Sequence, residues 1–119
     1  MKLAVIIPVY NAENTIRKAV KSIDTTHDVE IICINDGSTD RTKQVLTELQ
    51  KEVKHLIVYH QDNQGAAKSR NMGLSAMSDD IDAFMFLDAD DQFLPGKMDQ
   101  MIQYYEKNEH LDIVIGQIG

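Results

Sequence analysis

Short runs of consecutive apolar residues alternate along the chain with segments in which apolar residues recur every three or four positions. A short continuous run is typical of a strand buried on both faces of a sheet, whereas the three-to-four spacing is typical of an amphipathic helix. The runs predict five strands, at residues 3–7, 29–34, 56–60, 83–87 and 111–115.

Four helices are predicted between and after these runs. The first has apolar side chains at positions 16, 19, 20 and 23 and a candidate cap in Asn11. The second is predicted to be capped by Ser38 or Thr39, the third begins near Ala66, and the fourth covers residues 98–107. The residues expected to bury the middle two helices are Val45, Leu46 and Leu49 in the second and Ala67, Met72 and Met77 in the third.

Strands that alternate with helices predict an α/β fold, with a mostly parallel sheet covered on both faces and built from right-handed crossovers. Open sheets of this kind bind ligands at the carboxyl ends of their strands, where polar residues are therefore candidates for function. Four predicted strands end in such residues: Pro8, Tyr10 and Asn11 after the first, Asn35 and Asp36 after the second, Gln61 to Gly65 after the third, and Asp88 to Asp91 after the fourth. We expect these segments to converge on one edge of the sheet.

The length, net charge and cysteine content of the chain limit the classes of protein to which it can belong. The chain has 119 residues, 43% of them hydrophobic, which suits one domain over residues 1–119 with a core of its own. Its net charge of −7 argues against binding to nucleic acid or anionic lipid. No run reaches the roughly 18 apolar residues of a membrane span. Cys33 is the only cysteine, so an internal disulfide is impossible and a cytoplasmic location is expected.

The stretch FMFLDADDQF places Asp88, Asp90 and Asp91 directly behind an apolar run. Like charges at this spacing repel one another. A solvated acidic turn would explain them, as would negative charge placed to favour the N-terminus of a following helix. A third interpretation is a site for a hard divalent cation, because Mg²⁺, Mn²⁺ and Ca²⁺ bind oxygen-rich clusters.

Four segments, IIPVYNAENTI, INDGSTDRT, NQGAAKSRNMGL and FLDADD, follow one another in this order. Together they resemble the N-terminal half of a family-2 glycosyltransferase with the Rossmann-like GT-A fold, and the resemblance covers Val5 to Gly116. It implies a nucleotide-diphosphate sugar as donor, usually a UDP-sugar. It also implies a divalent cation, Mg²⁺ or Mn²⁺, bound through a D-x-D motif, here Asp88-Ala89-Asp90.

The resemblance implies a role for each matching residue. The residues that line the nucleobase pocket would be Pro8, Tyr10, Asn11 and Glu13. The others would be Asp36 at the base, Lys68 and Arg70 approaching the nucleotide, Asp88 at the ribose, and Asp90 with Asp91 at the metal.

Most of these residues also have an ordinary structural interpretation. Asn11 would serve as a helix cap, Tyr10 as a packed aromatic, and Asp36 as a turn former ahead of Gly37. Lys68 and Arg70 would lie on a solvated helix face. Physical chemistry favours a metal independently of the resemblance. An acidic protein repels a sugar diphosphate unless a cation bridges the two. During transfer, the same cation would offset the negative charge that develops on the departing diphosphate.

Other protein classes fit less well. An EF-hand loop starting at Asp88 would have Phe93 where the turn needs glycine and Asp99 where it needs glutamate. A receiver domain should have an acidic pair after the first strand, where this chain has PVYN, and a lysine after the fifth, where it has GQIG. A haloacid-dehalogenase-like phosphatase needs a small or hydroxylated residue where Gln92 stands. A P-loop needs a second glycine beside Lys68.

The resemblance stops short of the acceptor-binding half. In inverting relatives that half supplies the carboxylate that deprotonates the acceptor hydroxyl, so the general base is expected beyond residue 119 and the fold is expected to be truncated. Two functions of different class remain open: the donor-binding half of a glycosyltransferase, for example in polysaccharide biosynthesis, and a nucleotide-sugar-binding module that never catalyses. The acceptor is unassigned. A missing half would leave apolar surface uncovered, so we also expect homo-oligomers.

Overall fold

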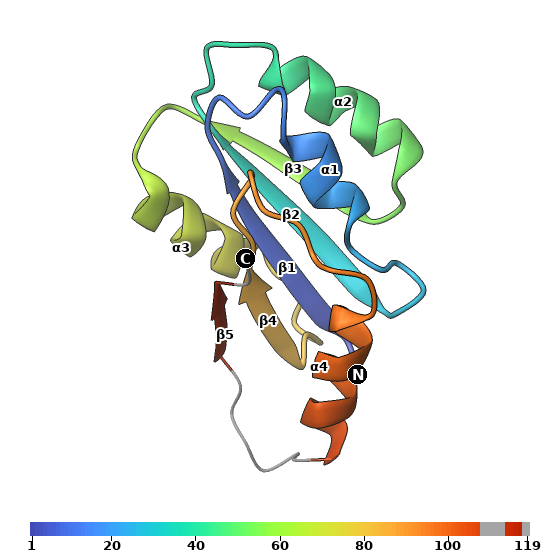
Figure 1. The fold of residues 1–119 in the computed structure, drawn as a ribbon. Helices are drawn as coiled ribbons and strands as arrows, with labels where there is room; N and C mark the ends of the chain where they lie inside the picture. The colour runs from blue at the N-terminus through green and yellow to red at the C-terminus, as the bar shows by residue number, and fades with distance from the viewer. Residues whose placement is uncertain (108–113, 118–119) are drawn as a thin grey trace.

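The structure is a computed structural model that describes residues 1–107 and 114–117. Strands and helices alternate strictly within it (Figure 1). The strands are β1 (Leu3–Val9), β2 (Val29–Asp36), β3 (Leu56–Gln61), β4 (Ala83–Phe86) and β5 (Val114–Gln117). The helices are α1 (Ile16–Lys21), α2 (Thr42–Glu52), α3 (Ala66–Ala76) and α4 (Lys97–Lys107). The predicted α/β fold is confirmed.

The strands form one sheet in the order β3-β2-β1-β4-β5, and every neighbouring pair is parallel. The chain therefore builds outward from β1 through β2 to β3, and then returns to the other side of β1 to add β4 and β5. The direction of winding reverses between β1 and β4. This is the position at which open parallel sheets leave a crevice at the carboxyl ends of their strands.

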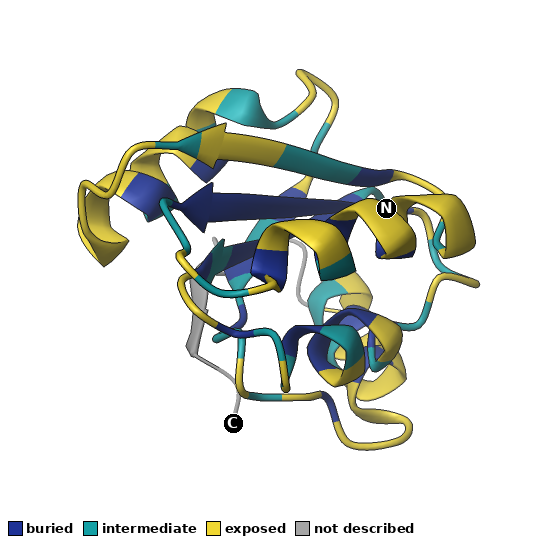
Figure 2. Cartoon of the chain, turned by 90° about the horizontal axis from the view of Figure 1, so that it is seen from above, coloured by how far each residue is buried: buried dark blue, intermediate teal, exposed yellow. Residues whose placement is uncertain are grey.

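The sheet is buried on both faces, which explains why its central strands are apolar without alternation. Leu3, Val5 and Ile7 face a core shared with α1, α2 and α4, whereas Ile6 belongs to a second cluster on the α3 side. Figure 2 shows the result, with central strands buried along their length and helices exposed on their outer sides. The core thus stabilises the sheet, and the polar candidate residues lie beyond the carboxyl ends of its strands.

Helix α3 packs through small side chains, and the prediction that Ala67 and Met72 are buried is wrong. Both are exposed, whereas Ser69 and Gly73 are buried, one helical turn apart. A Cβ atom at Gly73 would lie 2.3 Å from Cγ2 of Ile6, so no side chain fits without displacement. The predicted packing of Met77 is confirmed, since it is partly buried against the α3-side cluster.

The capping predictions are wrong, because the polar side chains concerned join loops to one another. Helix α1 begins after Thr15, and Asn11 lies upstream with a positive φ of 46°. Helix α2 begins after Arg41, beyond both Ser38 and Thr39.

The predicted last strand at residues 111–115 lies partly outside the described residues, and the observed strand covers Val114–Gln117.

The thiol of Cys33 should not react with aqueous thiol reagents while the protein is folded. Cys33 lies in β2 with none of its surface exposed, and this burial raises its pKa to about 12. At pH 8 the group is therefore a buried neutral thiol, whereas the reactive form is the thiolate. We expect no labelling by a chromogenic disulfide reagent in buffer and one equivalent in 6 M guanidinium. Rapid labelling of the folded chain would contradict this packing.

Candidate functional site

An acidic cluster lies directly behind β4. Oxygen atoms of Asp88, Asp90 and Asp91 all lie within 4.8 Å of one another. Asp88 and Asp91 are partly buried and Asp90 is exposed. The Asp91 amide donates to the carbonyl of Asp88 at 3.0 Å, which closes the turn, and the Leu87 amide donates to the carbonyl of Ile6 at 3.0 Å. This donor set fits a hard divalent cation, and the backbone holds it beside β1.

The segment after β1 borders the same edge of the sheet. Pro8 is partly buried near the end of β1. Tyr10 follows it, and 52% of its surface is exposed although it is a large aromatic residue. An exposed aromatic ring at the edge of an open sheet is a candidate for stacking on a planar ligand. The packed-aromatic interpretation of Tyr10 therefore does not hold in this structure.

Asn11 joins this segment to the loop between β2 and α2. Its side-chain oxygen accepts a hydrogen bond from the Thr39 amide at 2.8 Å, and its own amide donates to the Ser38 hydroxyl at 3.0 Å. Asparagine tolerates the left-handed conformation observed here better than most residues. The side-chain oxygen of Asn11, a predicted pocket residue, is therefore engaged in a hydrogen bond that holds two loops together.

Asp40 contributes to the same junction and was missed by sequence reasoning. Its carboxylate accepts hydrogen bonds from the Thr42 amide at 2.9 Å and the Glu13 amide at 3.3 Å. Burial alone raises the pKa of Asp40, but the hydroxyl and amide of Thr42 and the Glu13 amide outweigh it, so the pKa lies below its usual value. The available signal was the D-x-T spacing, because aspartate commonly bonds the backbone two residues ahead.

Asp36 is the most buried acidic residue among the predicted site residues, with 4% of its surface exposed. Three N–H groups donate to its carboxylate, from the Gln61 side chain and from the amides of Gln64 and Gly65. Burial alone raises the pKa of Asp36, but these three donors outweigh it, so the pKa lies below its usual value. The carboxylate is therefore ionised and bound into the loop between β3 and α3.

The two predicted basic residues differ in their surroundings. Lys68 is exposed on α3. Arg70 is partly buried, and its guanidinium carbon lies 5.9 Å from the centre of the Phe86 ring. Phe86 is the last residue of β4 and precedes Asp88 by two positions. Arg70 therefore brings a positive charge to the end of the strand that carries the acidic cluster.

The structure thus brings the predicted residues to one edge of the sheet, although not into one contact network. The loops after β1, β2, β3 and β4 all leave the sheet at its upper edge in Figure 1. Asn11 and Glu13 bond the loop after β2, Asp36 bonds the loop after β3, and the acidic cluster follows β4. The expected convergence of strand ends is confirmed.

A second group of potential metal ligands lies away from this edge. Atoms of Asp24, His27 and Asp99 lie within 4.8 Å of one another, between the loop that precedes β2 and the first turn of α4. His27 Nε2 is hydrogen-bonded to Asp99 Oδ1, and the Thr26 amide donates to Asp24 at 3.0 Å. These contacts account for the group as a hydrogen-bonded junction that ties α4 to the loop.

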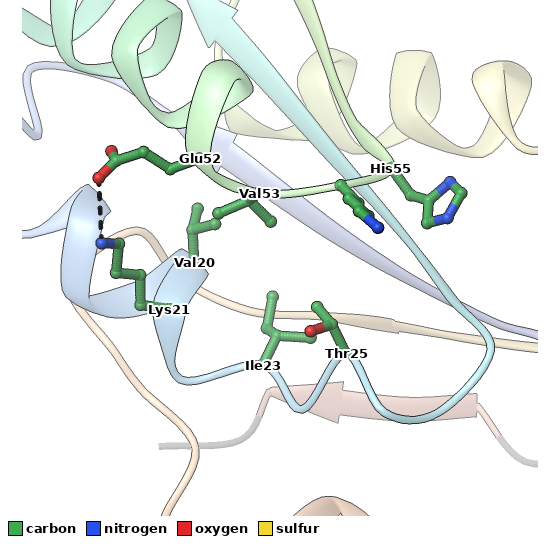
Figure 3. Close-up of a pocket in the computed structure, with 8 residues that line it drawn as sticks. Val20, Lys21, Ile23, Thr25, Glu52, Val53 and His55 are labelled. Carbon is green, nitrogen blue, oxygen red and sulfur yellow. Dashed lines mark hydrogen bonds and ion pairs between the residues drawn. The ribbon is translucent and has the colours of Figure 1, made fainter.

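A cavity of about 510 Å³ also lies away from the acidic cluster (Figure 3). It separates the ends of α1 and α2, and its lining residues are Val20, Lys21, Ile23, Thr25, Glu52, Val53, Lys54 and His55. Lys21 and Glu52 pair across it at 3.3 Å. Size alone does not make it the functional site, because the cluster of convergent carboxylates lies at the other end of the strands.

Comparison with known proteins shows which family carries this arrangement of strand ends. Residues 4–119 match the family described as "Glycosyl transferase family 2". The chain belongs to this glycosyltransferase family. The match covers all four of the sequence segments that carry the predicted site.

Individual relatives agree with the family assignment. TagX of Staphylococcus aureus (strain MRSA252), which carries a provisional glycosyltransferase name, is 40% identical over 98% of this chain and 34% of its own length. An uncharacterized glycosyltransferase of Nostoc sp. is 35% identical over 98% of this chain and 38% of its own. The chain therefore spans about a third of the length of these curated relatives.

Solved structures extend the match to the fold. The crystal structure of S. aureus TarS 1-349 superimposes with a TM-score of 0.80 at 26% identity, over 92% of this chain and 33% of TarS 1-349. The same protein in complex with UDP gives a TM-score of 0.79 at 25% identity. The sheet and helices described above thus have the GT-A arrangement of a glycosyltransferase, and they correspond to about a third of the TarS 1-349 chain.

Proposed function

We propose that this chain forms the donor-binding part of a metal-dependent glycosyltransferase that uses a nucleotide-diphosphate sugar, most simply a UDP-sugar. The observation that carries the proposal is the group of three carboxylates at the point where the winding of the sheet reverses. The UDP complex of the structurally similar TarS supports the choice of nucleotide.

The proposed contacts follow the order of the strand ends. Tyr10, with Pro8 beside it, offers the exposed ring on which a nucleobase stacks. Asp88 accepts hydrogen bonds from the ribose hydroxyls. Asp90 and Asp91 hold Mg²⁺ or Mn²⁺. A cation held by these carboxylates would supply positive charge that offsets the negative charge of the leaving diphosphate.

The basic residues complete the electrostatic account. The chain carries 19 acidic side chains against 12 lysines and arginines, so its field opposes an anionic donor. Arg70 of α3, whose guanidinium lies over the Phe86 ring at the end of β4, supplies positive charge beside the site, and Lys68 lies two residues earlier on the same helix. Two basic side chains beside three carboxylates leave the site negative, which is why donor binding should depend on the cation.

Transfer itself requires more than donor binding. We infer an inverting displacement in which a carboxylate deprotonates the acceptor hydroxyl, a contribution of about 10²–10⁴-fold to the rate. This base and the acceptor surface belong, in our proposal, to the part of the relatives' length that these 119 residues do not span.

The cytoplasmic location and self-association stay predictions. Among the described residues, no helix has the length and apolar character needed to cross a membrane.

UDP should bind this chain only when Mn²⁺ or Mg²⁺ is present. Without the cation, the negatively charged diphosphate meets three carboxylates at close range. We expect titration calorimetry to show saturable binding in Mn²⁺ and no measurable heat after chelation.

Calcium serves as the control cation in the same titration, since its larger radius and higher coordination number suit this small donor set less well. Equal affinity for UDP with Mn²⁺ and with chelator would contradict the metal bridge. Absence of binding under every condition would contradict the proposed function.

A further inference from the structure

The carboxylate of Asp36 holds a stretch of backbone at the edge of the proposed donor site. Its Oδ1 accepts hydrogen bonds from the Gln64 amide at 2.7 Å and from Gln61 Nε2 at 2.9 Å. Its Oδ2 accepts a hydrogen bond from the Gly65 amide at 3.0 Å. Hydrogen bonds from amides to an ionised carboxylate are stronger than those between neutral groups, so this contact determines where the loop lies.

The same network reaches the first turn of α3. Gln61 Nε2 also donates to the Ser69 hydroxyl at 3.1 Å, and that hydroxyl donates to the carbonyl of Gly65 at 3.0 Å. Ser69 is fully buried. One buried acid, through Gln61 and Ser69, is therefore connected to the start of the helix that carries Lys68 and Arg70.

The backbone around Asp36 is closely packed against this loop. The Asp36 carbonyl accepts a hydrogen bond from Asn63 Nδ2 at 3.2 Å. A Cβ atom at Gly37 would lie 2.7 Å from the Asn63 amide nitrogen. Gly65, which precedes α3, has a φ of 97°, a conformation that few residues other than glycine adopt. The loop therefore has little freedom as long as the carboxylate bonds persist.

We propose that Asp36 is a positioning residue for the donor, which fixes the loop 63–65 and thereby places the first turn of α3, with Lys68 and Arg70, beside the nucleotide site. This inference rests on the proposed function. It is compatible with the base contact that the resemblance implies, because within the described residues Oδ2 accepts one hydrogen bond and retains room for a second. The distinguishing property is that Asp36 acts on the loop even when no nucleotide is bound.

Asp36→Asn tests this directly. An asparagine has one oxygen and one NH₂ group, so it must turn an N–H donor toward an N–H donor of the loop and lose at least one of the bonds to Gln64 or Gly65. We expect amide hydrogen exchange at these two positions to be about 10–100-fold faster without nucleotide. The affinity for UDP with Mn²⁺ should fall by about tenfold, the effect expected of a supporting residue.

Asp91→Asn is the matched control, because it makes the same chemical change in the acidic cluster and should leave exchange at Gln64 and Gly65 unaltered. Unchanged exchange in Asp36→Asn would overturn the positioning role, and so would faster exchange with unaltered UDP affinity. If the unsubstituted chain binds no UDP, the proposed function fails, although the exchange result still reports on the loop.

A second measurement needs no variant. Protonation of Asp36 should shift the amide proton resonances of Gln64 and Gly65 together in an acid titration of the unsubstituted chain. The pKa of Asp36 lies below its ordinary value of 3.8, so the bonds should persist at pH 4 and weaken only as the pH falls further. Independent movement of the two resonances, or none, would overturn the proposal even if Asp36→Asn failed to fold.

Discussion

Replacement of Asp90 by asparagine is expected to lower the affinity for UDP in the presence of Mn²⁺ by about 10–100-fold or more, since removal of a group that merely supports a metal ligand already costs that much. Asp90 is the exposed member of the acidic cluster, so its replacement leaves no buried polar group without a partner. A neutral amide is a poorer ligand for a hard cation than a carboxylate. Titration of the variant with UDP at saturating Mn²⁺ measures the loss.

The same substitution should leave the folded state intact, because three mutually repelling carboxylates become two. We expect an unchanged or slightly higher melting temperature without metal. Asp79→Asn serves as the control, since Asp79 is also exposed but lies between α3 and β4, away from the cluster. If Asp90→Asn binds UDP and Mn²⁺ as tightly as Asp79→Asn, Asp90 is a turn residue and the metal lies elsewhere.

Gly73→Val is expected to cause the largest loss of stability, about 3 kcal/mol in the free energy of unfolding. A Cβ atom would lie 2.3 Å from a methyl group of Ile6, whose own side chain is fully buried in the centre of the sheet. Either α3 moves away from β1 or Ile6 leaves its rotamer, and both reduce packing. The melting temperature should fall by roughly 10 °C.

Ser75→Val provides the matched control for this substitution. Ser75 lies on the exposed side of the same helix, so the change adds a β-branched residue without the steric clash. We expect Ser75→Val to alter stability by less than about 0.5 kcal/mol. Equal denaturation midpoints in urea for the two variants would show that α3 does not pack on β1 through Gly73.

The sheet was predictable because a strand buried on both faces needs continuous apolar residues, and the runs at residues 3–7 and 29–34 have no other simple interpretation. The convergence of strand ends follows from parallel pairing, so Asp36 and Asp88 could be placed on one edge from sequence alone. The identity of the pocket residues depended instead on the resemblance to the family, since no periodicity distinguishes Tyr10 as an exposed ring.

The incorrect predictions for α3 and for the helix caps concern contacts that local sequence patterns do not reveal. The contact face of α3 consists of Ser69 and Gly73, which carry no hydrophobic signal, so the larger Met72 was assigned to the core although it is exposed. Local patterns likewise suggested Asn11 as a helix cap, whereas its side chain bonds to a loop 28 residues away. Tertiary hydrogen bonds of this length have no local sequence signature, and the bond from the Glu13 amide to Asp40 is another example.

The central claim is that a divalent cation and a nucleotide meet where the loops after β1 and β4 come together. Paramagnetic broadening by Mn²⁺ tests it most directly, in ¹⁵N spectra of the 119-residue chain with UDP present. We predict that substoichiometric Mn²⁺ first broadens the amide resonances of residues 88–91 and 9–11, and that Mg²⁺ in excess restores them. Broadening centred on Asp24, His27 and Asp99 instead, or spread evenly over the surface, would contradict the account.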